Sequence, residues 1–166
     1  AEDHDSNLIK TGIGQLKTRG AKFVSINPVR TGYSAVADEW IGIRPGTDGL
    51  FVMSLIRELL LAGKIDEEYL VRYTNVHWLV TQNEGEENHG LYIRDADGVA
   101  QCWDGEKLAL AAVSDVNAKP TLIGEIELPD GRKAVPSFEL LARHFLDNQY
   151  APEAVAAATG VAAGII

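Results

Sequence analysis

Two short polar segments of this chain carry side chains that could bind a nucleotide. Asn-Pro-Val-Arg-Thr at 27–31 offers an amide, a guanidinium and a hydroxyl, and Pro-Gly-Thr-Asp at 45–48 offers a tight turn followed by a carboxylate. Each segment ends a short apolar run, Lys-Phe-Val-Ser-Ile-Asn in the first case and Trp-Ile-Gly-Ile in the second. The pattern indicates two strands that each lead into a ligand-binding loop.

The chemistry of the second loop favours a base over a phosphate. Thr47 and Asp48 precede an apolar helix, and the free N–H groups of a helix N-terminus attract anions. The Asp48 carboxylate would repel a phosphate, but its two oxygens match the adjacent N1–H and N2–H₂ donors of guanine. Such a charge-assisted bond is worth roughly 1.5–3 kcal/mol. Arg30 and Arg44 are the expected phosphate partners. The alternative is that Asp48 only caps the helix and that 27–31 is an ordinary turn.

The two strands must be parallel for the loops to meet. Both runs are nearly continuously apolar, which is typical of strands covered on both faces. The connection, residues 28–39, is long enough for a parallel crossover. Parallel strands end at the same edge of a sheet, where open α/β folds bind their ligands. An α/β fold is therefore expected.

The remaining segments supply helices and a second type of sheet. We expect helices at 6–19, 49–62, 65–74 and after 137, and the helix at 49–62 is apolar nearly all round, so it should be buried against the sheet. Residues 76–136 alternate like antiparallel strands, with turns at Asp-Ala-Asp-Gly and Pro-Asp-Gly-Arg; residues 104–120 fit no pattern. We expect one α/β domain, 1–166, that contains a β-hairpin-rich insertion at 76–136.

The composition excludes several classes of protein. The formal net charge is −9, and no Lys/Arg cluster forms a basic face, so nucleic acid is not an expected partner. The single cysteine excludes a disulfide framework or a Cys-rich metal site within these residues. The four histidines lack ligand spacing, so we expect no metal site. No apolar run is long enough to span a membrane.

No residue pattern predicts catalysis by this chain. Cys102 lies on an expected strand and is interpreted as a small core residue, not as a nucleophile. The fingerprint Gly-x-Gly-x-x-Gly is absent after either strand, because Gly12–Gly20 precedes the first strand and lies in a helix. A Walker A motif is also absent. We therefore expect no catalytic residue, no standard NAD site and no P-loop.

The block from Gly20 to Thr74 resembles the molybdopterin oxidoreductases of the dimethyl sulfoxide reductase family. That family has a helix ending in Arg-Gly-Ala-Lys, a strand ending in Asp-Pro or Asn-Pro, an Arg-Thr, and an Ala-Asp before an apolar strand. Pro-Gly-Thr-Asp then opens a long helix, and a second helix ends in Tyr-Thr; all of these are present here. The tail at 150–166 is similar to a family helix with Thr-Gly-Val. Together the likeness covers most of residues 7–166.

The resemblance implies a fold and a ligand. It implies a Rossmann-like, mainly parallel sheet with flanking helices, which holds one guanosine diphosphate arm of the bis(molybdopterin guanine dinucleotide) molybdenum cofactor. Asp48 would accept hydrogen bonds from the guanine. Asn27 stands where many family members have Asp, but its amide can still donate and accept hydrogen bonds. By motif, the contact residues are Asn27, Pro28, Val29, Arg30, Thr31, Gly46, Thr47 and Asp48.

In that family the other parts of the active site lie outside the segment that this chain resembles. These parts are the molybdenum ligand, the second guanosine site and the iron–sulfur cysteines. We therefore expect a domain excised from a longer oxidoreductase and inactive alone, whose partners are the remaining parent domains and an iron–sulfur electron-transfer subunit. The alternative is a free-standing α/β module that binds a protein or small ligand and has no cofactor role.

Overall fold

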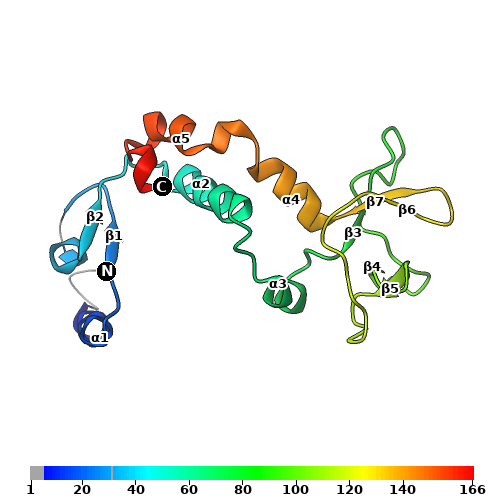
Figure 1. Ribbon diagram of the computed structural model, residues 1–166, viewed down its shortest axis with the longest axis horizontal. Coiled ribbons are helices and arrows are strands. Elements are labelled where there is room, and N and C mark those ends of the chain that lie inside the picture. Colours follow the sequence, from blue (N-terminus) through cyan, green and yellow to red (C-terminus); the bar gives the residue numbers. More distant parts are fainter. Residues whose placement is uncertain (1–5, 31) are drawn as a thin grey trace. The chain divides into compact units, whose positions relative to one another are not determined.

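The computed structural model describes residues 6–30 and 32–166 (Figure 1). Their contacts divide the chain into two compact units, each described by itself below. The first unit comprises the residues up to Glu58 together with Asn148–Ile166, and the second comprises Leu59–Asp147. The predicted nucleotide loops lie in the first unit.

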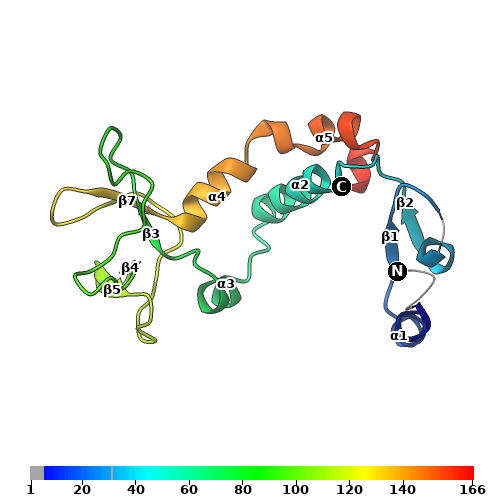
Figure 2. The same cartoon turned by 180° about the vertical axis from the view of Figure 1, so that it is seen from behind.

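The first unit contains a parallel strand pair. Strand β1 (Val24–Ile26) pairs with β2 (Glu39–Ile41), and Ile26 lies opposite Ile41 (Figures 1 and 2). The crossover includes the 3₁₀ helix η1 (Gly32–Val36), whose buried Ser34 hydroxyl lies 2.7 Å from that of Ser25. The expected parallel arrangement of these two strands is thus confirmed.

Helices of the first unit form close to their expected positions. They are α1 (Ser6–Thr18), α2 (Asp48–Leu61), which continues past residue 58, η2 (Asn148–Tyr150), α5 (Pro152–Thr159) and η3 (Ala163–Ile165). Pro152 occupies the first turn of α5, where its missing N–H costs nothing, and Gly160 ends that helix at φ 75°. Ile43, Phe51 and Val161 form the buried core of the unit.

The second unit holds the antiparallel strands. Its elements are α3 (Glu67–Tyr73), β3 (Leu79–Thr81), β4 (Gln101–Asp104), β5 (Ala109–Ala112), β6 (Ile126–Glu127), β7 (Lys133–Pro136) and α4 (Ser137–Phe145). One sheet has the order β3-β7-β6, and β4 and β5 form a separate hairpin. Both expected turns are present. The Asp95 carboxylate accepts from the Val99 N–H at 2.9 Å, and Gly131 adopts φ 83°. Leu79 and Ile93 belong to the buried core.

One fold prediction is met only in part, and another needs correction. Among the described strands β1 and β2 form the only parallel pair, so the fold is α/β with small sheets of mixed orientation. The expected burial of the first strand and of the long helix is not seen, since Ile26 and Val52 are 42% and 50% exposed. A pair of three-residue strands has too little surface to cover these faces. Strand β5 was not predicted, because Ala-Leu-Ala-Ala lacks alternation.

Candidate functional site

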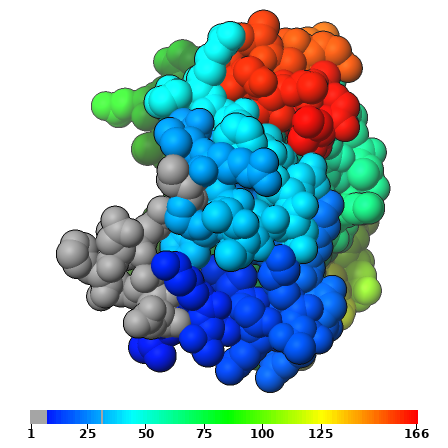
Figure 3. Space-filling view, turned by 90° about the vertical axis from the view of Figure 1, so that its left-hand side faces the viewer, coloured from blue at the N-terminus to red at the C-terminus, as the bar shows by residue number. Residues whose placement is uncertain are grey.

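Both predicted loops follow the carboxyl ends of the parallel strands β1 and β2. The Asn27 N–H donates to the Ile41 carbonyl at 3.1 Å, and the indole N–H of Trp40 donates to the Asn27 carbonyl at 3.0 Å. The start of the first loop is therefore fixed beside the end of β2. Figure 3 views the chain from the side on which its N-terminal segments, coloured blue to cyan, are seen. Trp40 therefore helps to position the loop through its indole N–H.

The first loop folds back on its own side chain. The Asn27 Oδ1 accepts from the Val29 N–H at 3.1 Å across Pro28, which leaves the Nδ2 donors available for a ligand. Arg30 is exposed, and its guanidinium makes no hydrogen bond or ion pair within the described part of the chain. Thr31, the last predicted contact of this loop, lies outside the described residues.

The second loop presents an unpaired carboxylate at a helix start. Gly46 adopts φ 81°, a conformation that suits glycine, and the Thr47 hydroxyl donates to the Arg44 carbonyl at 2.7 Å. The Thr47 carbonyl accepts from the Phe51 N–H at 3.1 Å and so begins α2. Asp48 is exposed and forms no side-chain hydrogen bond with the other described residues. The capping alternative for Asp48 therefore lacks a capping bond.

Arg44 has a different task from the one its sequence position predicted. Its Nη1 donates to the carbonyls of Ala157 at 2.7 Å and Ala158 at 3.4 Å, and its backbone N–H donates to the Thr159 carbonyl at 2.8 Å. The guanidinium thus satisfies carbonyls at the end of α5, where the helix dipole favours a positive charge. Arg30, in the first loop, keeps a guanidinium without a partner among the residues that the structure describes.

Two ion pairs lie at the opposite, amino edge of the strands. The Asp38 carboxylate accepts from the Phe23 N–H at 2.8 Å and pairs with Lys17 at 3.0 Å, and these contacts lower the pKa of Asp38. Lys22 pairs with Glu39 at 2.6 Å, and that hydrogen bond raises the pKa of the lysine. The amino edge is therefore electrostatically satisfied, whereas the carboxyl edge keeps Arg30 and Asp48 available for a ligand.

Three further observations concern residues outside the two loops. Cys102 lies in β4 with 1% exposure, and burial raises the pKa of its thiol, so it is protonated core rather than a nucleophile. Within residues 6–30 and 32–166, no group of three or more His, Cys, Asp or Glu could hold a metal ion. None of the helices described is both long and apolar enough to cross a membrane.

Comparison with known proteins identifies relatives. No family model matches the chain. A sulfite dehydrogenase subunit of Allochromatium vinosum is 43% identical over the whole chain, which spans 18% of that relative. The alpha subunit of a dimethylsulfide dehydrogenase from Rhodovulum sulfidophilum is 25% identical over 92% of the chain, again 18% of the relative. A formate dehydrogenase major subunit of Haemophilus influenzae is 37% identical over 48% of the chain and 8% of its own length.

These relatives share one cofactor chemistry. The sulfite dehydrogenase, formate dehydrogenase, nitrate reductase and dimethyl sulfoxide reductase chains among them are all molybdopterin oxidoreductases. The residues of both predicted loops fall within the match that covers the whole chain. The chain is therefore homologous to one segment of the molybdopterin oxidoreductases and matches a small part of their length.

Proposed function

We propose that this chain holds one guanosine diphosphate arm of a bis(molybdopterin guanine dinucleotide) cofactor within a larger molybdenum-dependent oxidoreductase. The observation that carries the proposal is the parallel direction of β1 and β2, whose carboxyl ends lead into two loops where Asp48 and Arg30 have no side-chain partner among the described residues. The relative that matches the whole of this chain is named as a sulfite dehydrogenase subunit, which favours a dehydrogenase as the parent enzyme.

Each loop has a distinct part in this proposal. Asp48 accepts from the N1–H and N2–H₂ groups of guanine, and Arg30 neutralises the diphosphate. Gly46, at positive φ, lets the backbone approach the ligand closely. Asn27 donates through Nδ2 because its Oδ1 is used within the loop. The remaining contacts are Pro28, Val29, Thr31 and Thr47.

The rest of the parent completes the fold in this proposal. The exposed apolar side chains of β1 and α2 include Val24, Ile26 and Val52. Further parallel strands supplied by the parent would cover these faces and produce the Rossmann-like, mainly parallel sheet. Residues 1–166 would then form one domain in which 76–136 is an insertion. An isolated strand pair of this length is otherwise only marginally stable.

The cofactor supplies oxygen-atom or electron transfer at molybdenum when it is bound. The residues of this chain bind and orient its nucleotide end and contribute no reacting group. The proposed electron partners are an iron–sulfur cluster elsewhere in the parent and a separate iron–sulfur electron-transfer subunit. The remaining parent domains would hold the other guanosine arm.

The test compares two single-carboxylate variants of the parent protein. Asp48→Asn removes one acceptor charge at the proposed guanine site, and Asp97→Asn is the matched control, an exposed aspartate in a turn of the second unit. Loss of the charge-assisted bond corresponds to an affinity about 10- to 150-fold lower. Molybdenum content and guanosine monophosphate released by acid should fall in Asp48→Asn alone. Retention of both at the wild-type level in Asp48→Asn would refute the site.

A further inference from the structure

The hairpin of β4 and β5 leaves one strand edge open. The Val113 N–H donates to the Ala100 carbonyl at 3.1 Å, which sets the alternation of the antiparallel ladder. Every second N–H of β5 therefore faces β4, and those of Leu110 and Ala112 face away from it. The Ala112 carbonyl accepts from the Asp115 N–H at 2.9 Å, but no hydrogen bond joins the N–H or carbonyl of Leu110 to another described residue.

The far edge of β4, in contrast, is covered. The Gln101 N–H donates to the Ile93 carbonyl at 2.9 Å, and the Trp103 carbonyl accepts from the Thr121 N–H at 3.0 Å. The open edge of the hairpin therefore belongs to β5.

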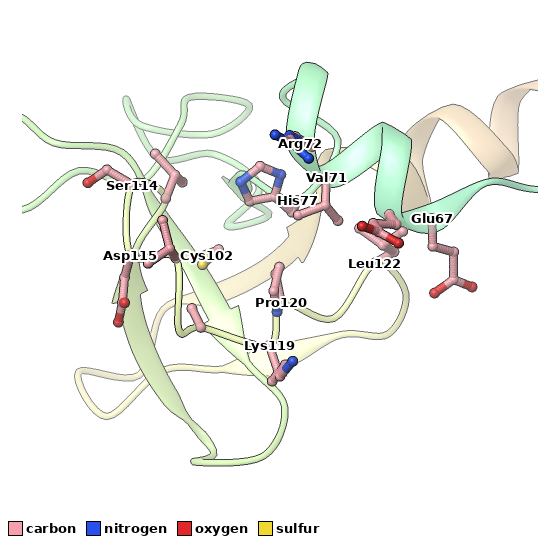
Figure 4. A pocket seen from close by; sticks show the side chains of 14 residues that line it. Glu67, Val71, Arg72, His77, Cys102, Ser114, Asp115, Lys119, Pro120 and Leu122 are labelled. Carbon is pink, nitrogen blue, oxygen red and sulfur yellow. The ribbon is translucent and has the colours of Figure 1, made fainter.

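A cavity of about 810 Å³ borders the same hairpin. Figure 4 shows Cys102 and Asp115 on one side of this cavity and Glu67 on the other. Its lining includes Val113, which follows β5, but none of the four residues of β5 itself. The open edge is therefore a surface distinct from the cavity.

The sequence of β5 does not protect this edge. Folded proteins usually block a free strand edge with charged residues or proline, because an open edge pairs readily with another chain segment. The edge strand β6 of the other sheet contains Glu127 and is flanked by Glu125 and Pro129. Residues 108–113, which include β5, read Leu-Ala-Leu-Ala-Ala-Val and have neither a charge nor a proline. The composition of β5 is that of a strand with a neighbour on both sides.

We propose that the open edge of β5 pairs with an extended apolar segment of the parent polypeptide that lies outside residues 1–166. The N–H and carbonyl of Leu110 would bond to the backbone of that segment, which is the chemistry of β-strand addition. Leu108 and Leu110 are 71% and 38% exposed, and apolar side chains of the segment would cover them. The four residues of β5 span about 13 Å, so a segment of similar length is sufficient.

The size of the edge favours a segment of the same polypeptide over a second molecule. Specific interfaces between two proteins bury about 800 Å² on each partner, and a four-residue strand edge supplies only a small part of that area. A segment of the same polypeptide has a high effective concentration, so a few hydrogen bonds are enough. This chain spans 18% of the sulfite dehydrogenase relative, which therefore extends well beyond the matched segment. The inference rests on the proposed parent enzyme but not on its nucleotide site.

Hydrogen exchange of the parent protein, resolved to single amides, tests the pairing. The amides of Leu110 and Ala112 should exchange at least about ten-fold more slowly than in an unstructured peptide. The Ala111 amide, which faces β4, is the internal control. Leu110→Pro removes the outward N–H and keeps the bonds to β4, whereas Leu110→Ala keeps both. Because one hydrogen bond is lost, the Ala112 amide should exchange about 2- to 12-fold faster in Leu110→Pro than in Leu110→Ala.

A photo-crosslinking residue identifies the segment that covers the edge. With p-benzoylphenylalanine in place of Leu108, mass spectrometry should find a product with residues of the same polypeptide outside 1–166. Free exchange of the Leu110 amide, or equal exchange of the Ala112 amide in the two variants, would overturn the pairing. A product with a second copy or another subunit, or no product, would overturn the proposed occupant.

The exchange measurement on the unmodified protein remains decisive even where a variant fails to fold. Guanosine content is measured separately, so failure here leaves the nucleotide proposal untouched.

Discussion

Arg44 and Arg30 lie close together in sequence, but the structure gives them opposite tasks. The Arg44 guanidinium donates to the Ala157 carbonyl at 2.7 Å and to the Ala158 carbonyl at 3.4 Å, whereas Arg30 has no partner among the described residues. Arg44→Met keeps the apolar stem and removes the Nη1 donor of both bonds. Only the shorter bond is strong, and water can reach the exposed carbonyls, so the variant should lose about 1 kcal/mol of stability.

The assay is urea and thermal unfolding of the 166-residue chain, followed by circular dichroism. For a domain of this size a loss of about 1 kcal/mol lowers the Tm by roughly 2–4 °C. Arg30→Met is the matched control, because an unpaired surface side chain usually changes stability by less than about 0.5 kcal/mol. In the parent protein the order should reverse, and Arg30→Met should release more of the bound guanosine than Arg44→Met.

Two results would refute these roles of Arg44 and Arg30. Equal losses of stability in the two variants would mean that the bonds from Arg44 to α5 contribute nothing measurable. Greater loss of guanosine in an Arg44→Met protein that is as stable as wild type would return Arg44 to the phosphate site that its position in the sequence suggested.

Three further predictions follow from individual features of the two units. The isolated chain should bind guanosine diphosphate weakly, because it would hold one arm of a two-armed cofactor. In an NMR titration only the signals of the two nucleotide loops should shift, and tight binding would contradict the proposal. Leu79 has no exposed surface, so Leu79→Ala should lower the free energy of unfolding, measured in urea, by about 2–5 kcal/mol. A decrease below about 1 kcal/mol would mean that this core is poorly packed. The Lys107 N–H above all lowers the pKa of buried Asp104 from 3.8 to about 2. The stabilisation that the ionised Asp104 carboxylate provides is therefore complete above its unfolded pKa and is lost as pH falls from about 4 towards 2. Asp104→Asn should flatten that part of the curve of stability against pH.

Much of the local structure could be predicted from sequence alone, because near neighbours decide it. The connection of residues 28–39 predicted parallel strands, and Pro152 and Gly160 marked the start and end of α5. The turn at Asp95 depends on a side chain that bonds to its own loop. The parallel direction of β1 and β2 places the starts of both loops after the carboxyl ends of the strands, as the sequence predicted, whereas the ligand of these loops stays a prediction.

Only the tertiary structure decided which side chains remain free for a ligand. Arg44 is tied to carbonyls 113 and 114 residues away, and no local pattern reports such a contact. The same holds for the cavity of the second unit, whose lining joins a helix, a strand and a loop. Sequence determined the loops and their chemistry because adjacent residues build them, whereas long-range packing determined which of their charges are already paired.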